Sequence, residues 1–187
     1  MTNLKNIKPN TRYLKDIKGI IYDKKWLKTA SDNLELYYMY RGIEKQGNKR
    51  YDVTIIPPKM LGKEFVKTKG HKHSPREIYK VLKGKAIFLI QKTRNKIVED
   101  VFAIKANQND LIIIPPNYDH ITINPINKEL QLGNWISKNC KNNYKSIEKM
   151  EGACYFYVKS AKNKTAWIKN KNYKKIPKLR FEKPFKK

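Results

Sequence analysis

The stretch that decides the fold is Gly70-His71-Lys72-His73-Ser74-Pro75-Arg76-Glu77-Ile78-Tyr79, which continues into the apolar run Ile87-Phe88-Leu89-Ile90. Two histidines at positions i and i+2 of an extended segment point to the same side, because side chains alternate along a strand. Glu77 follows a Ser-Pro turn, so a hairpin-like return brings its carboxylate beside both imidazoles. Two imidazoles and one carboxylate with an open face suit a borderline divalent metal, and the stretch therefore predicts a metal site.

A third histidine strengthens this prediction. The chain contains only three histidines, and His120 follows the strand-like segment Leu111 to Ile114 and a Pro-Pro turn. An isolated His-x-His pair is common in proteins that bind no metal. Here, however, all three histidines fall in two strand-turn-strand segments, and the turn aims His120 back at the first pair. We therefore expect His120 to complete the site.

The length and the apolar content set limits on the class of protein. A chain of 187 residues and 22.2 kDa is long enough for one domain with a buried core. No apolar run approaches the roughly 20 residues of a membrane-spanning helix. The first residues lack the apolar core of a signal peptide. Cys140 and Cys154 form neither a disulfide framework nor a zinc spacing. We expect a cytoplasmic protein with reduced thiols and no membrane partner.

The net charge is +26 at neutral pH. Such a charge suits nucleic-acid binding, because Lys and Arg neutralise phosphates. The lysines are nevertheless spread along the whole chain, together with many Asn and Ile, and no nucleic-acid motif is recognisable. We interpret the charge as a compositional drift that fills the solvent faces with lysine, and nucleic acid as a disfavoured partner. A positive field still attracts small anionic substrates.

The rest of the chain contains many short strand patterns separated by turn residues. Strands are expected at 34–40, 51–56, 78–82, 86–91, 97–104, 111–114, 121–124, 130–136 and 155–158, and a short helix at 144–150. We expect 78–82 and 86–91 to pair through a tight turn at Lys83-Gly84. This pattern predicts an antiparallel sandwich or small barrel. The expected division is an N-terminal arm over 1–33, a core domain over 34–168 and a basic tail over 169–187.

The order of the motif residues resembles the two motifs of the cupin superfamily. His71, His73, Glu77 and Gly84 match the first motif, and His120 with Asn124 matches the second. The resemblance implies an all-β cupin fold, a double-stranded β-helix or jelly-roll barrel, with the N-terminal arm and a short C-terminal helix or tail. Asn109 and Asn117 stand at glycine positions of the second motif, where Asn tolerates a positive φ better than most residues.

A more specific resemblance covers about Tyr51 to Tyr144. The segments Leu61–His73, Glu77-Ile78-Tyr79 and Pro115-Pro116 resemble the cupin-type glucose-6-phosphate isomerases of archaea and some bacteria. The resemblance implies a metal-dependent isomerase that interconverts glucose 6-phosphate and fructose 6-phosphate in glycolysis and gluconeogenesis. One divalent ion per subunit is implied, with Fe²⁺ favoured over Mn²⁺, Ni²⁺, Co²⁺ or Zn²⁺. Its ligands are His71, His73, Glu77 and His120.

The same resemblance implies the substrate residues and the assembly. The substrate phosphate is bound by Thr54, Thr68, Gly70 and Tyr144, and Tyr79, which lines the sugar site, is a catalytic candidate beside Glu77. Glu77 is a candidate catalytic base, with a purely ligating role as the equal alternative. A homodimer is implied, and the aromatic strand at 34–40 is a candidate for its interface.

Other interpretations stay open. The two threonines are also ordinary strand residues, and Tyr144 is also a core aromatic. The enzyme alternatives are isomerisation of another sugar phosphate, such as mannose 6-phosphate, and a metal-dependent oxygenase. The alternative from another class is a non-catalytic basic cupin that binds sugar or nucleic acid. Turnover of a panel of sugar phosphates, oxygen consumption and salt-sensitive duplex binding separate these alternatives.

Overall fold

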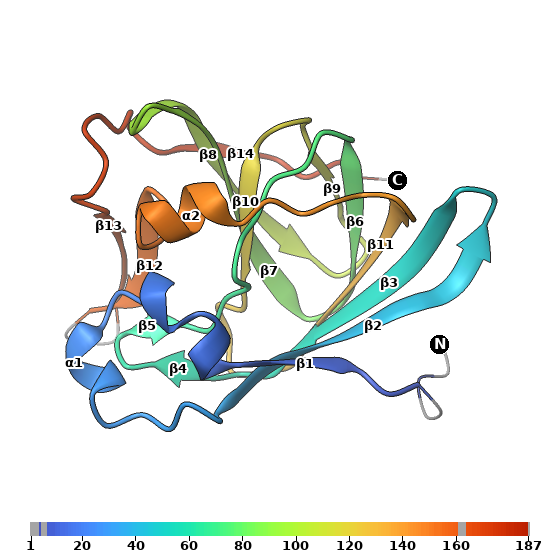
Figure 1. Cartoon of the computed structure of the whole chain (residues 1–187), viewed down its shortest axis with the longest axis horizontal. Helices are drawn as coiled ribbons and strands as arrows, with labels where there is room; N and C mark the ends of the chain where they lie inside the picture. Colours follow the sequence, from blue (N-terminus) through green and yellow to red (C-terminus); the bar gives the residue numbers. More distant parts are fainter. Residues whose placement is uncertain (1–3, 5–6, 161–163, 187) are drawn as a thin grey trace.

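The computed structural model describes residues 4, 7–160 and 164–186 and consists mainly of β-strands (Figure 1). The strands are β1 (Asn10–Tyr13), β2 (Glu35–Gln46), β3 (Lys49–Ile56), β4 (Met60–Leu61), β5 (Glu64–Phe65), β6 (Glu77–Lys83), β7 (Lys85–Arg94), β8 (Ile97–Asn107), β9 (Leu111–Ile114), β10 (Asp119–Ile123), β11 (Leu130–Ser137), β12 (Tyr155–Lys159), β13 (Thr165–Lys169) and β14 (Arg180–Glu182). The helices are all short: the 3₁₀ turns η1 (Leu14–Asp16) and η2 (Lys18–Ile20), and the α-helices α1 (Lys24–Leu27) and α2 (Lys145–Lys149).

Three sheets make up the barrel and its side wall. A six-stranded sheet has the order β1-β2-β3-β11-β6-β9, and a four-stranded sheet has the order β10-β7-β8-β14. A second four-stranded sheet, β13-β12-β5-β4, lies beside α1 at one end (Figure 1). Among the described strands every pairing is antiparallel except β14 with β8. The prediction of an all-β cupin jelly roll is confirmed.

The burial of β6 shows how the sheet positions the motif residues. Along this strand buried and exposed residues alternate, so Glu77, Tyr79 and Val81 face inward while Ile78 and Lys80 face outward. This is the two-residue period of a strand with one face on the core. The carboxylate and the tyrosine predicted for the site therefore enter the interior from the same strand.

The expected hairpin at Lys83-Gly84 is wrong. β6 pairs with β9 and β11, whereas β7 pairs with β8 and β10, so the chain passes from one sheet to the other at this point. Gly84 has φ +86°, and a Cβ atom there would lie 2.6 Å from the carbonyl oxygen of Glu129. The glycine is needed for a crossover between sheets, because only it fits this backbone angle and this close approach.

The two asparagines of the second motif have the predicted backbone conformation. Asn109 has φ +74° and Asn117 has φ +63°. The amide of Asn117 donates to the carbonyl oxygen of His73 at 2.8 Å, which fixes the turn before β10 against the first motif. The glycine positions of the motif are thus filled by residues that keep the turns.

Both ends of the described chain pack on the barrel. At the N-terminal end β1 pairs with β2, and Leu14 and Ile17 are buried in the main core. At the other end β14 runs beside β8, and the backbone of Phe185 exchanges two hydrogen bonds with Leu111. The boundaries of arm, core domain and tail stay a prediction, and part of the arm lies outside the described residues. No helix in the described part of the chain has the length and apolar character needed to cross a bilayer.

Candidate metal centre and substrate pocket

Three histidines and one glutamate meet inside the barrel, and they come from three segments of the chain. His71 and His73 lie in the loop before β6, Glu77 begins β6, and His120 lies on β10. One ligand atom from each of the four lies within 4.8 Å of those of the others. Two backbone hydrogen bonds between His71 and His120, of 2.9 and 3.3 Å, bring their segments together. The structure therefore assembles the four residues predicted from the sequence.

The hydrogen bonding of His73 shows that this cluster suits a cation. Its Nδ1 lies 2.7 Å from the carbonyl oxygen of Pro75, and its Nε2 lies 2.8 Å from Oε2 of Glu77. Both ring nitrogens face oxygen acceptors, yet a neutral imidazole carries only one hydrogen. The ring must be protonated, or a cation must share the position of the second proton. With Nδ1–H fixed on Pro75, the lone pair of Nε2 is directed into the cluster.

His120 is a second residue of the cluster that suits a cation. Its Nε2 is buried, has no hydrogen-bond partner among the described residues, and lies 3.5 Å from Oε2 of Glu77. A buried polar atom without a partner is unfavourable and rare in folded proteins. Three imidazoles and one carboxylate are a donor set for Fe, Mn, Co, Ni or Zn. The residues present thus fit a divalent metal ion.

The charges within the cluster agree with this arrangement. Burial, assisted by the neighbouring His120, lowers the pKa of His71 well below its ordinary value, so this ring is neutral. Burial alone would raise the pKa of Glu77, but its contacts with His120 and His73 outweigh burial and hold that pKa below its usual range. For His73 burial favours a lower pKa, and the hydrogen bond to Glu77 outweighs it and raises the pKa. His71 and Glu77 are therefore in the forms that bind metals, a neutral imidazole and an ionised carboxylate.

Asn134 supports the cluster from β11, and the sequence analysis missed it. Its side-chain amide donates to Oε1 of Glu77 at 2.7 Å, and the residue is buried. The sequence contains a signal for Asn134: Leu130, Leu132 and Asn134 alternate along one strand, so their side chains all face inward. A polar residue at an inward position of an apolar strand indicates a buried partner.

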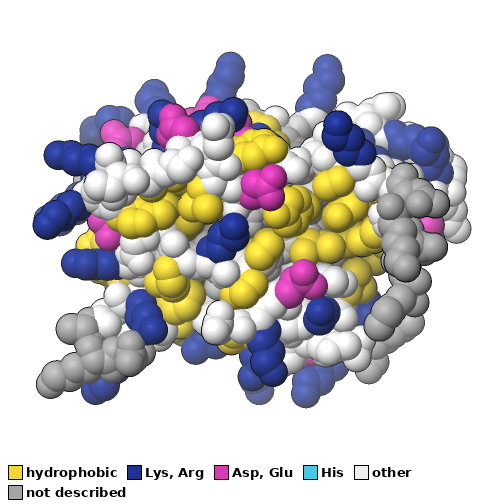
Figure 2. Space-filling model, turned by 90° about the horizontal axis from the view of Figure 1, so that it is seen from below, with side chains coloured by type: hydrophobic (Ala, Val, Ile, Leu, Met, Phe, Trp, Pro, Cys, Tyr) yellow, Lys and Arg dark blue, Asp and Glu magenta, His cyan; other side chains and the backbone are white. Residues whose placement is uncertain are grey.

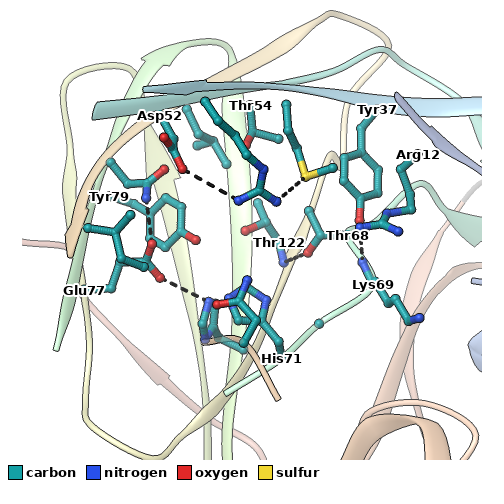
Figure 3. Close-up of a pocket in the computed structure, with 18 of the residues that line it drawn as sticks. Arg12, Tyr37, Asp52, Thr54, Thr68, Lys69, His71, Glu77, Tyr79 and Thr122 are labelled. Carbon is teal, nitrogen blue, oxygen red and sulfur yellow. Dashed lines mark hydrogen bonds and ion pairs between the residues drawn. The ribbon is translucent and has the colours of Figure 1, made fainter. Parts of the chain in front are cut away.

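The cluster lies at the edge of a pocket that also contains the predicted substrate residues. Thr54, Thr68, Gly70, Tyr79 and Tyr144 all line it, together with three of the four residues of the cluster. Figure 3 shows Glu77, Tyr79 and Asp52 on one side and Arg12, Tyr37 and Lys69 on the other, with the threonines between them. The predicted residues therefore surround one space.

Comparison with known proteins agrees with this site. The sequence pattern of "Glucose-6-phosphate isomerase (GPI)" matches residues 11–177. The chain belongs to this family. It is 32% identical over 128 residues to a glucose-6-phosphate isomerase of Thermococcus litoralis, which covers 65% of both chains. It is 33% identical over 120 residues to that of Pyrococcus abyssi, which covers 60% of this chain and 61% of the relative. The match thus spans less than two thirds of the length of either relative.

This member of the GPI family was also compared with solved structures. A cupin-2 domain from Rhodospirillum rubrum is 12% identical and superposes with a TM-score of 0.44, over 56% of this chain and 62% of that chain. The assignment of the fold therefore rests on the strand order and pairing described above.

The expected phosphate residues of this GPI-family chain differ in how free they are to bind. The Thr68 hydroxyl already accepts a hydrogen bond from the amide of Thr122 at 3.0 Å. Gly70 has φ +76°, and a Cβ atom there would lie 2.4 Å from Cγ1 of Ile121, so the backbone can be this close to β10 only with glycine. Tyr144 begins the turn into α2, and its ring centre lies 5.7 Å from that of His71.

Asn124, the other residue matched to the second motif, lies away from the pocket. Its side-chain amide donates to the carbonyl oxygens of Ile56 and Lys128, both at 2.9 Å. It therefore holds a turn.

Several further polar residues of the pocket were not predicted. Arg12, Tyr37 and Arg41 line it, as does Asp52, which is buried on β3. Asp52 lies two residues before Thr54, so both side chains face the same way. That shared phase is a signal that sequence inspection can use, whereas Arg12 lies far from every motif in the sequence.

Proposed function

We propose that this protein is a metal-dependent isomerase that interconverts glucose 6-phosphate and fructose 6-phosphate. The observation that carries the proposal is the His₃Glu cluster beside Thr54, Thr68, Gly70 and Tyr144 in one pocket of a GPI-family chain. The relatives named above are called glucose-6-phosphate isomerase, which supports the same reaction. The substrate is then a sugar phosphate, and the reaction belongs to glycolysis and gluconeogenesis.

The proposed cofactor is one divalent ion per chain, with Fe²⁺ as the first choice. His71, His73, Glu77 and His120 would hold it. When bound, a divalent ion acts as a Lewis acid that favours the negative charge developing on the sugar oxygens during aldose–ketose interconversion.

The other residues of the pocket have separate roles in the proposed reaction. Both oxygens of Glu77 are already engaged, Oε1 by Asn134 and Oε2 by His73, which supports a ligating role. The alternative is that Glu77 carries the proton between the adjacent sugar carbons. Burial raises the pKa of Tyr79 well above its ordinary value, so its hydroxyl stays protonated and can donate to a sugar oxygen. Thr54, Thr68, Gly70 and Tyr144 bind the phosphate.

The proposal includes a cytoplasmic homodimer. Figure 2 shows the face on the side of β1 and β2, with hydrophobic side chains spread across its middle among a few charged ones, and most lysines and arginines around its rim. The aromatic strand predicted at 34–40 overlaps the first half of β2, which begins at Glu35. Light scattering of the purified protein distinguishes a dimer from a monomer.

The test is conversion of fructose 6-phosphate after EDTA treatment and re-addition of Fe²⁺, Mn²⁺, Ni²⁺, Co²⁺ or Zn²⁺. We expect activity to disappear on chelation, to return with metal, and to be absent in the His71→Ala/His120→Ala variant. Mannose 6-phosphate and oxygen consumption are measured in parallel. Metal binding without turnover of fructose 6-phosphate would reject the isomerase, and oxygen uptake would favour an oxygenase.

A further inference from the structure

The positively charged residues of the pocket differ in their partners. Four of them line it: Arg12, Arg41, Arg50 and Lys69. Nε of Arg50 donates to both carboxylate oxygens of Asp52, at 3.0 and 3.1 Å. Nη1 of Arg41 lies 3.8 Å from the same carboxylate, and Nζ of Lys69 lies 2.7 Å from Glu148. Three of the four cations therefore have a carboxylate partner within the protein.

Arg12 has none among the described residues. Its Nε nitrogen is buried and makes no hydrogen bond. The partner of its guanidinium is the neutral Tyr37 hydroxyl, which also accepts the amide hydrogen of Lys69 at 3.0 Å (Figure 3). Arg12 is half-buried, and a partly desolvated charge without a counter-ion is unfavourable, because arginine cannot avoid that cost by losing its proton. Arg12 is therefore available to bind an anion from outside the protein.

The local backbone explains why Arg12 faces the pocket. It lies on β1 opposite Tyr37 of β2, so both side chains project from the same face of the sheet. The pairing shifts by one residue directly after Arg12, and such bulges re-aim side chains next to binding sites. Leu14 and Ile17, just after the bulge, are buried in the core and hold this segment in place. The position of Arg12 thus depends on its neighbours and needs no ion pair of its own.

We propose that Arg12 binds the phosphate group of the substrate, and this inference rests on the proposed function. The guanidinium is a planar fork whose N–H groups match two phosphate oxygens. Arg12 lies on the same side of the pocket as Lys69, with Thr54 and Thr68 between it and Glu77 (Figure 3). A phosphate at Arg12 directs the sugar carbons toward the histidines and Glu77. The N-terminal arm is then part of the active site.

The variant that tests this is Arg12→Met, which keeps the length of the side chain and removes its charge. We expect KM for fructose 6-phosphate to rise about 10- to 100-fold while kcat changes little, because a charged hydrogen-bonding partner of the bound substrate is lost. We also expect inorganic phosphate to raise the melting temperature of the wild type and to have less effect on the variant. The melting temperature without ligand should stay unchanged or rise, because a half-buried charge without a counter-ion has been removed.

Two controls separate this role from a structural one. Arg94→Gln removes one charge from an exposed position at the end of β7, and it should reproduce none of these effects. Arg12→Lys keeps the charge but loses the forked guanidinium. Its KM and its phosphate-dependent shift in melting temperature should lie between those of the wild type and of Arg12→Met. Fructose tested beside inorganic phosphate and fructose 6-phosphate shows whether the phosphate group alone is recognised.

The results distinguish the inference from the proposed function. If the wild type isomerises fructose 6-phosphate and Arg12→Met has an unchanged KM, the role of Arg12 is wrong while the isomerase stands. If the wild type converts no sugar phosphate, the proposed function fails. The phosphate-dependent shift in melting temperature then decides whether Arg12 binds phosphate. A shift in wild type that is lost in Arg12→Met supports Arg12 as a phosphate ligand. Equal shifts, or none in either protein, overturn it.

Discussion

Two clusters of buried charge in this barrel have opposite hydrogen-bonding character. In the first, Nζ of Lys67 donates to Oε1 of Glu64 at 2.5 Å and to the carbonyl oxygen of Ile20 at 2.9 Å. The other oxygen of Glu64 accepts the amide hydrogen of Tyr22 at 2.9 Å. In the second, the cluster around Glu77, the buried Nε2 of His120 has no hydrogen-bond partner among the described residues.

The difference separates a structural use of charge from a binding use. Glu64 and Lys67 fasten the segment around η2 to β5, and both of their charged groups find partners inside the protein. Such a pair holds a segment in register but leaves no capacity for a ligand. The histidine cluster keeps one unsatisfied nitrogen atom, Nε2 of His120, at a pocket, and Arg12 keeps an unsatisfied Nε in the same pocket. Unpaired polar atoms mark where ligands are expected.

The largest expected effect is that of Glu77→Gln. This change keeps the shape of the side chain and removes the charge that a divalent ion requires. We expect metal affinity and turnover to fall at least ~1000-fold, because the Lewis acid contributes several kcal/mol to such reactions. Metal content after dialysis and the initial rate with fructose 6-phosphate measure both. A variant that keeps one tightly bound metal ion would remove Glu77 from the ligand set.

Glu64→Ala should lower the stability of the fold and leave metal binding unchanged. It leaves Lys67 buried without its partner, which destabilises a protein by about 3–5 kcal/mol. The metal content of the folded fraction should stay that of the wild type, because the pair takes no part in the site. Urea unfolding measures the free energy of unfolding. The double variant Glu64→Leu/Lys67→Met should recover most of the stability, and its failure to do so would mean that the charges themselves are needed.

Asn134→Ala should have an intermediate effect. It removes the amide that donates to Oε1 of Glu77, and the loss of such an orienting partner lowers metal affinity by about 10- to 100-fold. A titration against a competing chelator measures the affinity. Asn139→Ala, at an exposed position after the same strand, is the matched control and should leave the affinity unchanged. Equal affinities of the two variants would show that Asn134 does not orient the carboxylate.

The smallest effect is expected at Asp100, which binds Arg180 on β14 near the surface. Hydrogen bonds from Arg180 and Tyr118 outweigh partial burial and lower the pKa of Asp100 below its ordinary value. A lowered pKa means that this stabilisation is present above about pH 4 and is lost as the pH falls below it. Compared with Asp100→Asn, the wild type should gain at most about 1 kcal/mol at neutral pH. Urea unfolding between pH 3 and 7 tests this, and a gap that widens toward acid would contradict it.

Sequence reasoning was most successful where the relevant contacts are local. The strand period placed His71 and His73 on one side, and the Ser-Pro turn brought Glu77 back within 2.8 Å of His73. The turn conformations of Asn109 and Asn117 followed from a property of the residue type. The apolar runs between turn residues were enough to predict an all-β fold, because strand periodicity is a property of a few consecutive residues.

Contacts between distant segments were decided by the tertiary structure. The chemistry of Lys83-Gly84 favours a turn, but only the pairing of β6 with β9 and β11 makes it a crossover between sheets. Asn134 meets Glu77 across 57 positions of the chain, and Arg12 enters the pocket from β1. The sequence by itself predicted the four residues of the cluster and the strands that carry Glu77 and His120. Which buried groups find partners was settled by folding, because a strand chooses its neighbours through hydrogen bonds to residues far away in the sequence.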